Sequence, residues 1–285
     1  MSLATPTAVF VGRSTLDLVY ACARFPEPDG KVDAELSYRA GGGPALNAAV
    51  AFAGLGGRAR LVSPVGKGPF ADEVRQDVGG HGVELLDAAP GQADVLPVSS
   101  IVLTGAARAI VNQPLPAASG ALADALIDGL FAERPAIVLS DGHLPELALP
   151  VLARARQAGV TTVLDGGSWK PWTATLLPLI DIAVVSSRFR PPGAADVLAH
   201  LGETIPAVAV TGGPHPILWR SGGASGEIVP PRVEAVDTLG AGDIFHGAFC
   251  HALAMGEDFA ASLTAAAAVA ARACTHWGPR AWIGA

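Results

Sequence analysis

The sequence predicts an α/β fold: a central, mostly parallel sheet with helices on both faces, and a small β flap that would serve as a lid. Three observations support this prediction. Short apolar runs are bounded by Gly or Pro, helical stretches alternate with them, and two regions interrupt the alternation. With 285 residues, 50% of them hydrophobic, the chain can bury one large core. We therefore expect a single domain over residues 1–285.

The expected strands are apolar and rich in β-branched residues, which is typical of strands buried on both faces. They cover residues 8–11, 136–139, 161–164, 182–185 and 207–210. The expected helices have apolar residues at helical spacing and end at or near Gly. They cover residues 45–55, 70–81, 147–158 and 194–201. Strands and helices that alternate in this way form right-handed βαβ units.

Residues 13–40 and 94–113 do not follow this rhythm. The second region contains VSSIVLTGAARAIVNQ, which has the pattern of strand, turn and strand around Thr104 to Ala107. We interpret the two regions as a small antiparallel flap on the main domain. Two ordinary surface excursions are the alternative interpretation.

The composition restricts the partners of the chain. The formal net charge is −7 and no run of basic residues occurs, so nothing favours a nucleic acid or an anionic membrane surface. No apolar stretch reaches the roughly 18 residues of a membrane span, and the start lacks the pattern of a secretory signal. Three widely spaced cysteines do not indicate a disulfide framework. We expect a cytoplasmic protein that binds small molecules.

The most informative segment is DTLGAGD, which runs from Asp237 to Asp243 and continues into a helical pattern. Gly240, Ala241 and Gly242 would start that helix, where free N–H groups and the helix dipole attract an anion such as phosphate. Asp243 could then accept the proton of an attacking hydroxyl. The alternative is that Asp243 only caps the helix and the glycines only form a turn.

Other enzyme classes fit less well. A dinucleotide-binding enzyme needs Gly-x-Gly-x-x-Gly after the first strand, but VFVGRSTLD has a single glycine there. A P-loop needs Gly-Lys-Ser/Thr, and Gly66-Lys67 is followed by Gly68. No Gly-x-Ser-x-Gly elbow occurs and the histidines do not pair at metal-ligand spacing. The sequence therefore predicts no hydrolase elbow and no protein-bound metal cluster.

A resemblance to a known family strengthens the interpretation of Asp243. DTLGAGDIFHGAF resembles the C-terminal signature of the ribokinase family of sugar kinases, also called the PfkB family. Residues 41–84 resemble its N-terminal signature, in the right order and at the right distance. The resemblance spans nearly the whole chain. It implies a ribokinase-like fold and an ATP-dependent carbohydrate kinase that uses Mg²⁺.

The resemblance also implies roles for individual residues. Asp243 would be the catalytic base, Gly240, Ala241 and Gly242 the anion hole, and Asp237 the residue that orders this loop on the cofactor side. The expected sugar-binding residues are an acidic residue, two glycines and an amide, which can bind vicinal hydroxyls at close approach. They are Asp17, Gly42, Gly43 and Asn47. Asp17 as a turn residue and Asn47 as an ordinary polar residue on a helix remain alternatives.

Thr211 and Gly213 match the strand and turn that line the nucleotide site in the family. Ser186 stands where much of the family has the Asn of an Asn and Glu pair that organises magnesium, and Arg190 follows it in VVSSRFRPP. This departure leaves the placement of magnesium open. Serine at this position also occurs in the ketohexokinase branch.

Several stretches resemble most the sulfofructose kinase and ketohexokinase branches. On that resemblance Lys31, Arg108 and Asn112 would face the substrate from the flap, and would suit a ketose with a second anionic group. His143 stands where the sulfofructose enzyme has an arginine, which leaves open whether the substrate carries a sulfonate.

Two other functions remain possible at this stage. A nucleoside kinase of the adenosine type shares both signatures, and a non-catalytic sugar- or nucleotide-binding protein could keep the same pocket. The flap strands could also support a homodimer.

Overall fold

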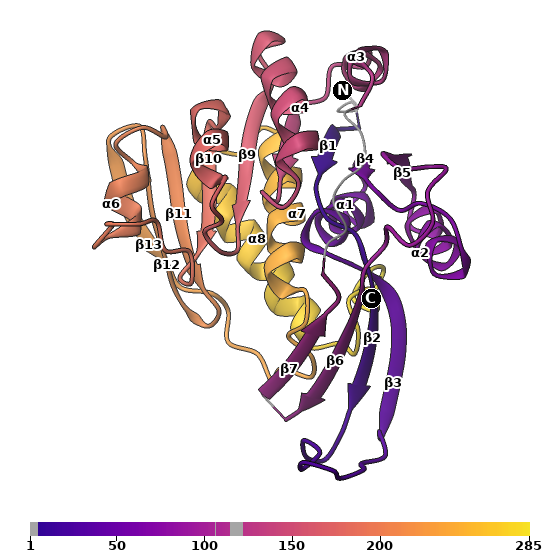
Figure 1. Cartoon of the computed structure of the whole chain (residues 1–285). Helices are drawn as coiled ribbons and strands as arrows, with labels where there is room; N and C mark the ends of the chain where they lie inside the picture. The colour runs from indigo at the N-terminus through magenta and orange to yellow at the C-terminus, as the bar shows by residue number, and fades with distance from the viewer. Residues whose placement is uncertain (1–4, 106, 115–121) are drawn as a thin grey trace.

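The computed structural model describes residues 5–105, 107–114 and 122–285 (Figure 1). Within these residues the chain forms a nine-stranded sheet of order β13-β12-β11-β10-β9-β8-β1-β4-β5 and a separate four-stranded sheet of order β3-β2-β6-β7. The strands from β5 to β11 pair in parallel, and only the β11-β12-β13 edge is antiparallel. The predicted mostly parallel sheet is confirmed.

All five strands expected from the sequence are present in the large sheet. Its strands are β1 (Thr7–Val11), β4 (Arg58–Ser63), β5 (Val83–Asp87), β8 (Ile137–Ser140), β9 (Thr161–Gly166), β10 (Ile182–Ser186), β11 (Ala207–Gly212), β12 (His215–Ser221) and β13 (Ala224–Ile228). Successive residues of β1 enter different cores, because Phe10 packs in one hydrophobic cluster and Val9 and Val11 in the other. The sheet is therefore buried on both faces.

Helices cover both faces of this sheet. They are α1 (Pro44–Gly54), α2 (Pro69–Gly80), α3 (Asp124–Phe131), α4 (Pro145–Gln157), α5 (Thr173–Leu176), the 3₁₀ turn η1 (Leu177–Leu179), α6 (Val197–Leu201), α7 (Ala241–Ala254) and α8 (Phe259–Cys274). Phe52 of α1, Phe249 of α7 and Leu263 of α8 pack in the core that contains Phe10. The helices α3 to α6 pack in the other core. The sheet with helices on both faces is the ribokinase-like arrangement that the sequence predicted.

One expected helix is shorter than predicted. Residues 194–201 were expected to be helical, but the helix begins at Val197. The side chain of Asp196 caps it by accepting a hydrogen bond of 3.1 Å from the N–H of Ala199. The preceding segment, PPGAA, has a proline pair and a Gly at positive φ, and it stays outside the helix.

The four-stranded sheet, called the lid sheet below, consists of β2 (Thr15–Ala21), β3 (Leu36–Gly42), β6 (Val98–Thr104) and β7 (Ala107–Asn112). It projects from one end of the main sheet (Figure 1). The expectation of an antiparallel flap is only partly right, because β2 and β6 pair in parallel. Each of the two sequence regions contributes one antiparallel pair, and the two pairs join side by side.

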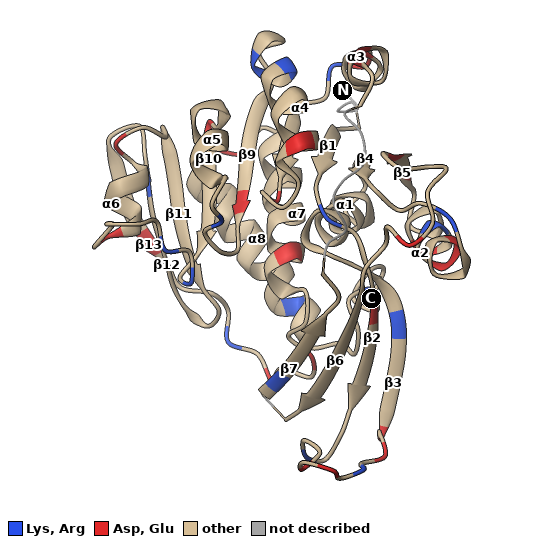
Figure 2. Cartoon of the chain, in the orientation of Figure 1, with Lys and Arg blue, Asp and Glu red and all other residues tan. Residues whose placement is uncertain are grey.

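Basic and acidic residues are interspersed over the elements of the described chain (Figure 2). None of the helices described here has the length and apolar character needed to cross a membrane. Cys22, Cys250 and Cys274 are free thiols, as their spacing indicated.

Candidate active site

Polar side chains gather where parallel strands of the main sheet end, and Ser186 is the one among them that the sequence analysis singled out. Arg13 follows β1, Asp141 follows β8, Asp165 lies near the end of β9, and Ser186 ends β10. The N-terminus of α1 is held at this edge too, because the N–H of Ala45 donates to Asp141 at 3.3 Å. Ligands of open α/β sheets bind at this carboxyl edge.

The start of α7 depends on a glycine. Gly240 has φ 74°, a left-handed conformation that favours Gly, and the N–H of Ile244 makes a helical bond of 2.9 Å to its carbonyl oxygen. No side chain among the described residues caps this helix. Gly242 is exposed. The first turn of α7 is therefore an uncapped, glycine-lined helix start that can receive an anion.

Asp243 lies in this first turn and is half-buried. Its Oδ2 accepts a hydrogen bond of 2.8 Å from Nδ2 of Asn47, in α1. Burial raises the pKa of Asp243 to about 7, with a further rise from the charge of Asp165, while the bond from Asn47 opposes the rise. A carboxyl group with such a pKa can both take up and release a proton near neutral pH.

Arg280, which sequence reasoning missed, fixes the amide of Asn47. Its Nη1 donates to Oδ1 of Asn47 at 2.9 Å, and its Nη2 donates to the carbonyl of Gly41 at 2.7 Å and to Asp77 at 3.1 Å. The Arg280 side chain is only 13% exposed. With Oδ1 occupied, the NH₂ group of Asn47 must point toward Asp243. Four residues from distant parts of the sequence thus form one hydrogen-bonded chain.

Asp237 is hydrogen-bonded within the loop before α7 and to two neighbouring segments. It is buried, and it accepts hydrogen bonds from the N–H of Leu239 at 2.8 Å, from the N–H of Gly278 at 3.2 Å and from the hydroxyl of Tyr38 at 3.2 Å. Its carboxylate is therefore occupied by protein donors. Tyr38 belongs to β3, so this bond also connects the lid sheet to the loop.

Asp17 and the two predicted glycines meet at the base of the lid sheet. A Cβ on Gly42 would lie 2.1 Å from a carboxylate oxygen of Asp17, and a Cβ on Gly43 would lie 2.3 Å from the carbonyl oxygen of Arg13. Gly43 also has φ 92°. Glycine is thus required at both positions for this approach. Burial raises the pKa of Asp17, and Oδ1 accepts a hydrogen bond of 2.6 Å from Thr15.

The structure brings only part of the predicted flap set together. Asp17, Ser99 and Asn112 are paired across β2, β6 and β7, so their side chains share one face of the lid sheet. Arg108 lies on that face as well, but about 13 Å further along β7. Lys31 lies in the exposed loop between β2 and β3, at the far end of the sheet from Thr15.

Three predicted cofactor-side residues lie at the ends of β10 and β11. Ser186 is paired with Thr211, and Gly213 follows with φ 63°. The hydroxyl of Ser186 accepts a hydrogen bond of 3.1 Å from the N–H of Arg188. Four strand spacings, about 19 Å, separate β11 from β1. The carboxyl edge of the sheet therefore has two separate regions where a ligand could bind, one at β10 and β11 and one beside the lid sheet.

Asp141 is a second residue that sequence reasoning missed. It is buried, and its carboxylate accepts hydrogen bonds from the N–H groups of Arg13 at 2.7 Å, His143 at 2.9 Å and Ala45 at 3.3 Å. The only signal in the sequence is its position directly after a predicted strand. It ties the ends of β1 and β8 to the start of α1.

His246 connects α7 to the main sheet. Its Nδ1 lies 2.7 Å from the carbonyl oxygen of Gly242 and 3.4 Å from Oδ2 of Asp165, and its Nε2 lies 3.0 Å from the carbonyl oxygen of Val184. Asp165 is buried, burial raises its pKa, and its Oδ2 has no hydrogen-bond partner among the described residues. This carboxylate oxygen accepts no hydrogen bond, and the charge of Asp165 acts on Asp243.

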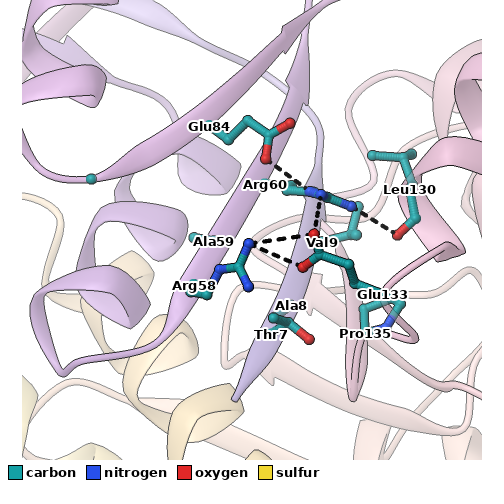
Figure 3. Close-up of a pocket in the computed structure, with 11 residues that line it drawn as sticks. Thr7, Ala8, Val9, Arg58, Ala59, Arg60, Glu84, Leu130, Glu133 and Pro135 are labelled. Atoms are coloured by element: carbon teal, nitrogen blue, oxygen red, sulfur yellow. Dashed lines mark hydrogen bonds and ion pairs between the residues drawn. The ribbon is translucent and has the colours of Figure 1, made fainter. Parts of the chain in front are cut away.

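A small pocket of about 140 Å³ lies at the opposite edge of the main sheet, where β1 and β4 begin (Figure 3). Its charged side chains bind one another. Arg58 pairs with Glu133 at 3.0 Å, and Arg60 pairs with Glu84 at 2.9 Å and with Glu133 at 3.2 Å. The charged side chains of this pocket are thus paired with one another, and none of the residues predicted for the functional site lines it.

A carboxylate beside a glycine-lined helix start, at the carboxyl edge of a parallel sheet, suits an enzyme that transfers a phosphoryl group. Residues 5–283 match the family described as pfkB family carbohydrate kinase, and the chain belongs to that family. The predicted family and enzyme class, an ATP-dependent carbohydrate kinase, are thereby confirmed.

Individual relatives agree with this membership. A crystal structure from Agrobacterium tumefaciens, of a protein described as a ribokinase, is 31% identical and has a TM-score of 0.86, over 98% of this chain and 94% of that one. The ribokinase of Staphylococcus aureus is 25% identical over 89% of this chain and 88% of its own. A 2-dehydro-3-deoxygalactonokinase of Haloferax volcanii is 29% identical over 87% of this chain and 86% of its own.

Proposed function

We propose that the protein transfers the γ-phosphoryl group of ATP to a hydroxyl of a small sugar, with Asp243 as the general base. The observation that carries this proposal is the position of Asp243: in the uncapped first turn of α7, with a pKa raised to about 7 and a hydrogen bond from Asn47. The base and the cradle for the transferred group then belong to the same helix turn.

The sugar would bind between the base of the lid sheet and the start of α1. Asp17 offers acceptors for vicinal hydroxyls, Gly42 and Gly43 permit close approach, and Asn112 lies on the same face of the lid sheet. The attacking hydroxyl gives its proton to Asp243 as its oxygen bonds to the γ-phosphorus, while the bond from that phosphorus to the oxygen shared with the β-phosphate breaks and ADP leaves. The N–H of Gly242 would bind the oxygens on which charge develops, together with the N–H of Ala241, which also donates a long hydrogen bond of 3.3 Å to the carbonyl oxygen of Thr238.

The nucleotide would occupy the other end of the edge, along Ser186, Thr211 and Gly213. Asp165 is the residue best suited to Mg²⁺, directly or through water, because its Oδ2 is buried and accepts no hydrogen bond among the described residues, with Nδ1 of His246 at 3.4 Å as its nearest charged neighbour. The described residues contain no group of three or more ligands that could hold a metal alone, which suits an ion held mainly by phosphates and water. Bound Mg²⁺ would neutralise charge on the phosphates.

The lid sheet would close over the sugar and exclude water, which favours transfer to the sugar over hydrolysis of ATP. Its edge strands β3 and β7 could also pair with a second copy. Three free thiols fit a reducing cytoplasm.

The test is ATP consumption by the purified chain with Mg²⁺ across aldoses, ketoses, sugar acids, sugar phosphates and nucleosides. We expect turnover with a sugar and a kcat lower by about 10² to 10⁴ with Asp243→Asn, although that variant should still bind the sugar. Turnover of nucleosides alone would favour a nucleoside kinase. Ligand binding without turnover of any acceptor would contradict the proposal and favour a binding protein.

A further inference from the structure

Arg13 lies at the junction between the two sheets, after β1 and before β2. Its backbone is held from two sides. The N–H donates to Asp141 at 2.7 Å, and the carbonyl oxygen lies where only a glycine can stand at position 43. The side chain therefore begins at a fixed point, between the end of β8 and the base of the lid sheet.

The guanidinium of Arg13 has no partner within the described chain. Nε and Nη2 are buried and make no hydrogen bond, and no carboxylate lies within ion-pair distance of the side chain. Buried donors without acceptors cost free energy, and such groups usually indicate a missing ligand or water. In a chain with 26 acidic and 19 basic residues, this cation is not unpaired for lack of carboxylates.

The neighbouring carboxylates are already engaged. Asp141 accepts three backbone hydrogen bonds, and Asp17 accepts one from Thr15. Both raise the pKa of Arg13 by their charge, but burial lowers it more. Their oxygens therefore stabilise the cation from a distance and leave its N–H groups available.

Two further basic groups lie on the same side. The backbones of His143 and Arg13 are held by the same carboxylate, because the N–H of Arg13 donates to Oδ2 of Asp141 and the N–H of His143 donates to Oδ1. Lys170 follows β9, and among the described residues its ammonium group has one hydrogen bond, of 3.3 Å to the carbonyl oxygen of Ser168. Burial lowers the pKa of both His143 and Lys170, the charge of Asp141 opposes this, and the positive charge of Arg13 makes a smaller further contribution that lowers both. A bound anion would relieve this repulsion.

We infer that Arg13, flanked by Lys170 and His143, binds an anionic group of the sugar, a carboxylate or a phosphate remote from the hydroxyl that is phosphorylated. The planar guanidinium offers paired donors that match such a group. This inference rests on the proposed kinase function. It moves the anion site from Lys31 and Arg108, which the sequence suggested, to the junction of the two sheets.

The anion belongs to the sugar rather than to ATP because of where Arg13 lies. Asp17 acts on Arg13 by its charge, and the carbonyl oxygen of Arg13 lies against Gly43. By contrast, Ser186 at the end of β10 lies three strand spacings from β1, and Thr211 and Gly213 lie four. The transferred phosphoryl group has its own cradle at the start of α7. An anion beside Arg13 would therefore belong to the acceptor.

The test compares matched pairs of neutral and acidic acceptors, such as an aldose, its aldonate and its terminal phosphate, in the wild type, Arg13→Met and Arg13→Lys. We expect the wild type to prefer an acidic acceptor by at least about 10-fold in kcat/KM. Arg13→Met should lower kcat/KM for that acceptor by about 100-fold, mainly through KM, and should leave KM for ATP and the neutral acceptor nearly unchanged. Which acidic acceptor is preferred tells a carboxylate from a phosphate.

The matched control is Arg154→Met, which removes a guanidinium from the outer helix α4, where it pairs with Asp128. It should leave the preference unchanged. Equal losses on neutral and acidic acceptors in Arg13→Met, or a wild type that prefers neutral sugars, would overturn the inference while the kinase function stands.

A binding measurement separates the anion-site proposal from the proposed kinase function. It also gives a result if Arg13→Met is less stable than the wild type, because it compares each protein with and without the ligand. Without ATP, the preferred sugar acid or sugar phosphate should raise the melting temperature of the wild type but not of Arg13→Met, and Arg13→Lys should retain part of the shift. If no acceptor is turned over, the proposed function fails, yet this shift would still support the anion site. No shift with any acidic sugar in the wild type would overturn it.

Discussion

Nδ2 of Asn47 lies 2.8 Å from Oδ2 of Asp243, although the two residues are 196 positions apart in the sequence. This hydrogen bond joins the two motifs that the sequence singled out separately. It also sets the direction of the Asp243 carboxylate, because one oxygen is held by the amide and the other remains available to a substrate hydroxyl.

Asp243→Asn should abolish proton transfer with little change in shape. An amide can keep the contact with Asn47 through its own oxygen but cannot act as a base. We expect kcat to fall by about 10² to 10⁴ and the Kd for the sugar to change little. Steady-state kinetics and calorimetric binding check this. A kcat within a few-fold of the wild type would remove Asp243 as the base.

The same substitution should stabilise the free protein at alkaline pH. The folded pKa of Asp243 is raised to about 7 by burial, so the folded state holds a proton that the unfolded state releases near pH 4. Stability from this group is therefore complete below about pH 4 and is lost as the pH rises through 7. Asparagine avoids this loss.

At pH 8 we expect Asp243→Asn to exceed the wild type by about 1–2 kcal/mol in free energy of unfolding, reduced from the full shift by partial exposure. The advantage should shrink as the pH falls to 5. Denaturant unfolding at the two pH values measures it. An advantage that stays constant with pH would mean that the pKa is not raised.

The sequence could predict the layers of the fold because its strands and helices carry strong periodic patterns. Segments such as 182–185 are apolar throughout, as a strand covered on both faces must be. The α7 start was predictable as well, because Gly240 and Gly242 precede an apolar helical pattern. These features depend on local sequence, which a single chain displays directly.

The sequence could not predict contacts made by tertiary packing. Arg280 acts through Asn47 and Asp77, which lie 233 and 203 positions away, and no local pattern marks it. The parallel pairing of β2 with β6 is also set by where both strands leave the main sheet. Lys31 was expected to face the substrate on the resemblance to the sulfofructose kinase branch, and its loop lies at the end of the lid sheet away from Thr15.

Arg280→Met should act on catalysis through Asn47. Without the bond to Oδ1, the Asn47 amide is free to rotate and its hydrogen bond to Asp243 weakens. Because that bond opposes the rise in the pKa of Asp243, the pKa should increase further. We expect kcat to fall by about 10- to 100-fold and the acid limb of the kcat/KM profile to move to higher pH.

The pH profile distinguishes this effect from simple destabilisation, which would lower activity without moving the acid limb. Arg272→Met is the matched control, because this arginine contacts the ring of Trp282 near the same terminus but lies outside the hydrogen-bonded chain. An unshifted acid limb in Arg280→Met would show that Arg280 does not orient Asn47.

Two glycines of the α7 start should respond differently to alanine. Gly240 is left-handed, so Gly240→Ala should cost about 1 kcal/mol of stability although its Cβ would find space, 3.6 Å from Nδ2 of Asn47. Gly242 lies in the helix, and no heavy atom lies within 4 Å of the point where an added Cβ would stand, so Gly242→Ala should keep or raise stability.

The methyl group of Gly242→Ala would nevertheless enter the space proposed for phosphate. We therefore expect Gly242→Ala to be well folded and at least about 10-fold less active, with a raised KM for ATP. Unfolding midpoints and kinetics for both variants test this, and a fully active Gly242→Ala would contradict phosphate binding at this turn.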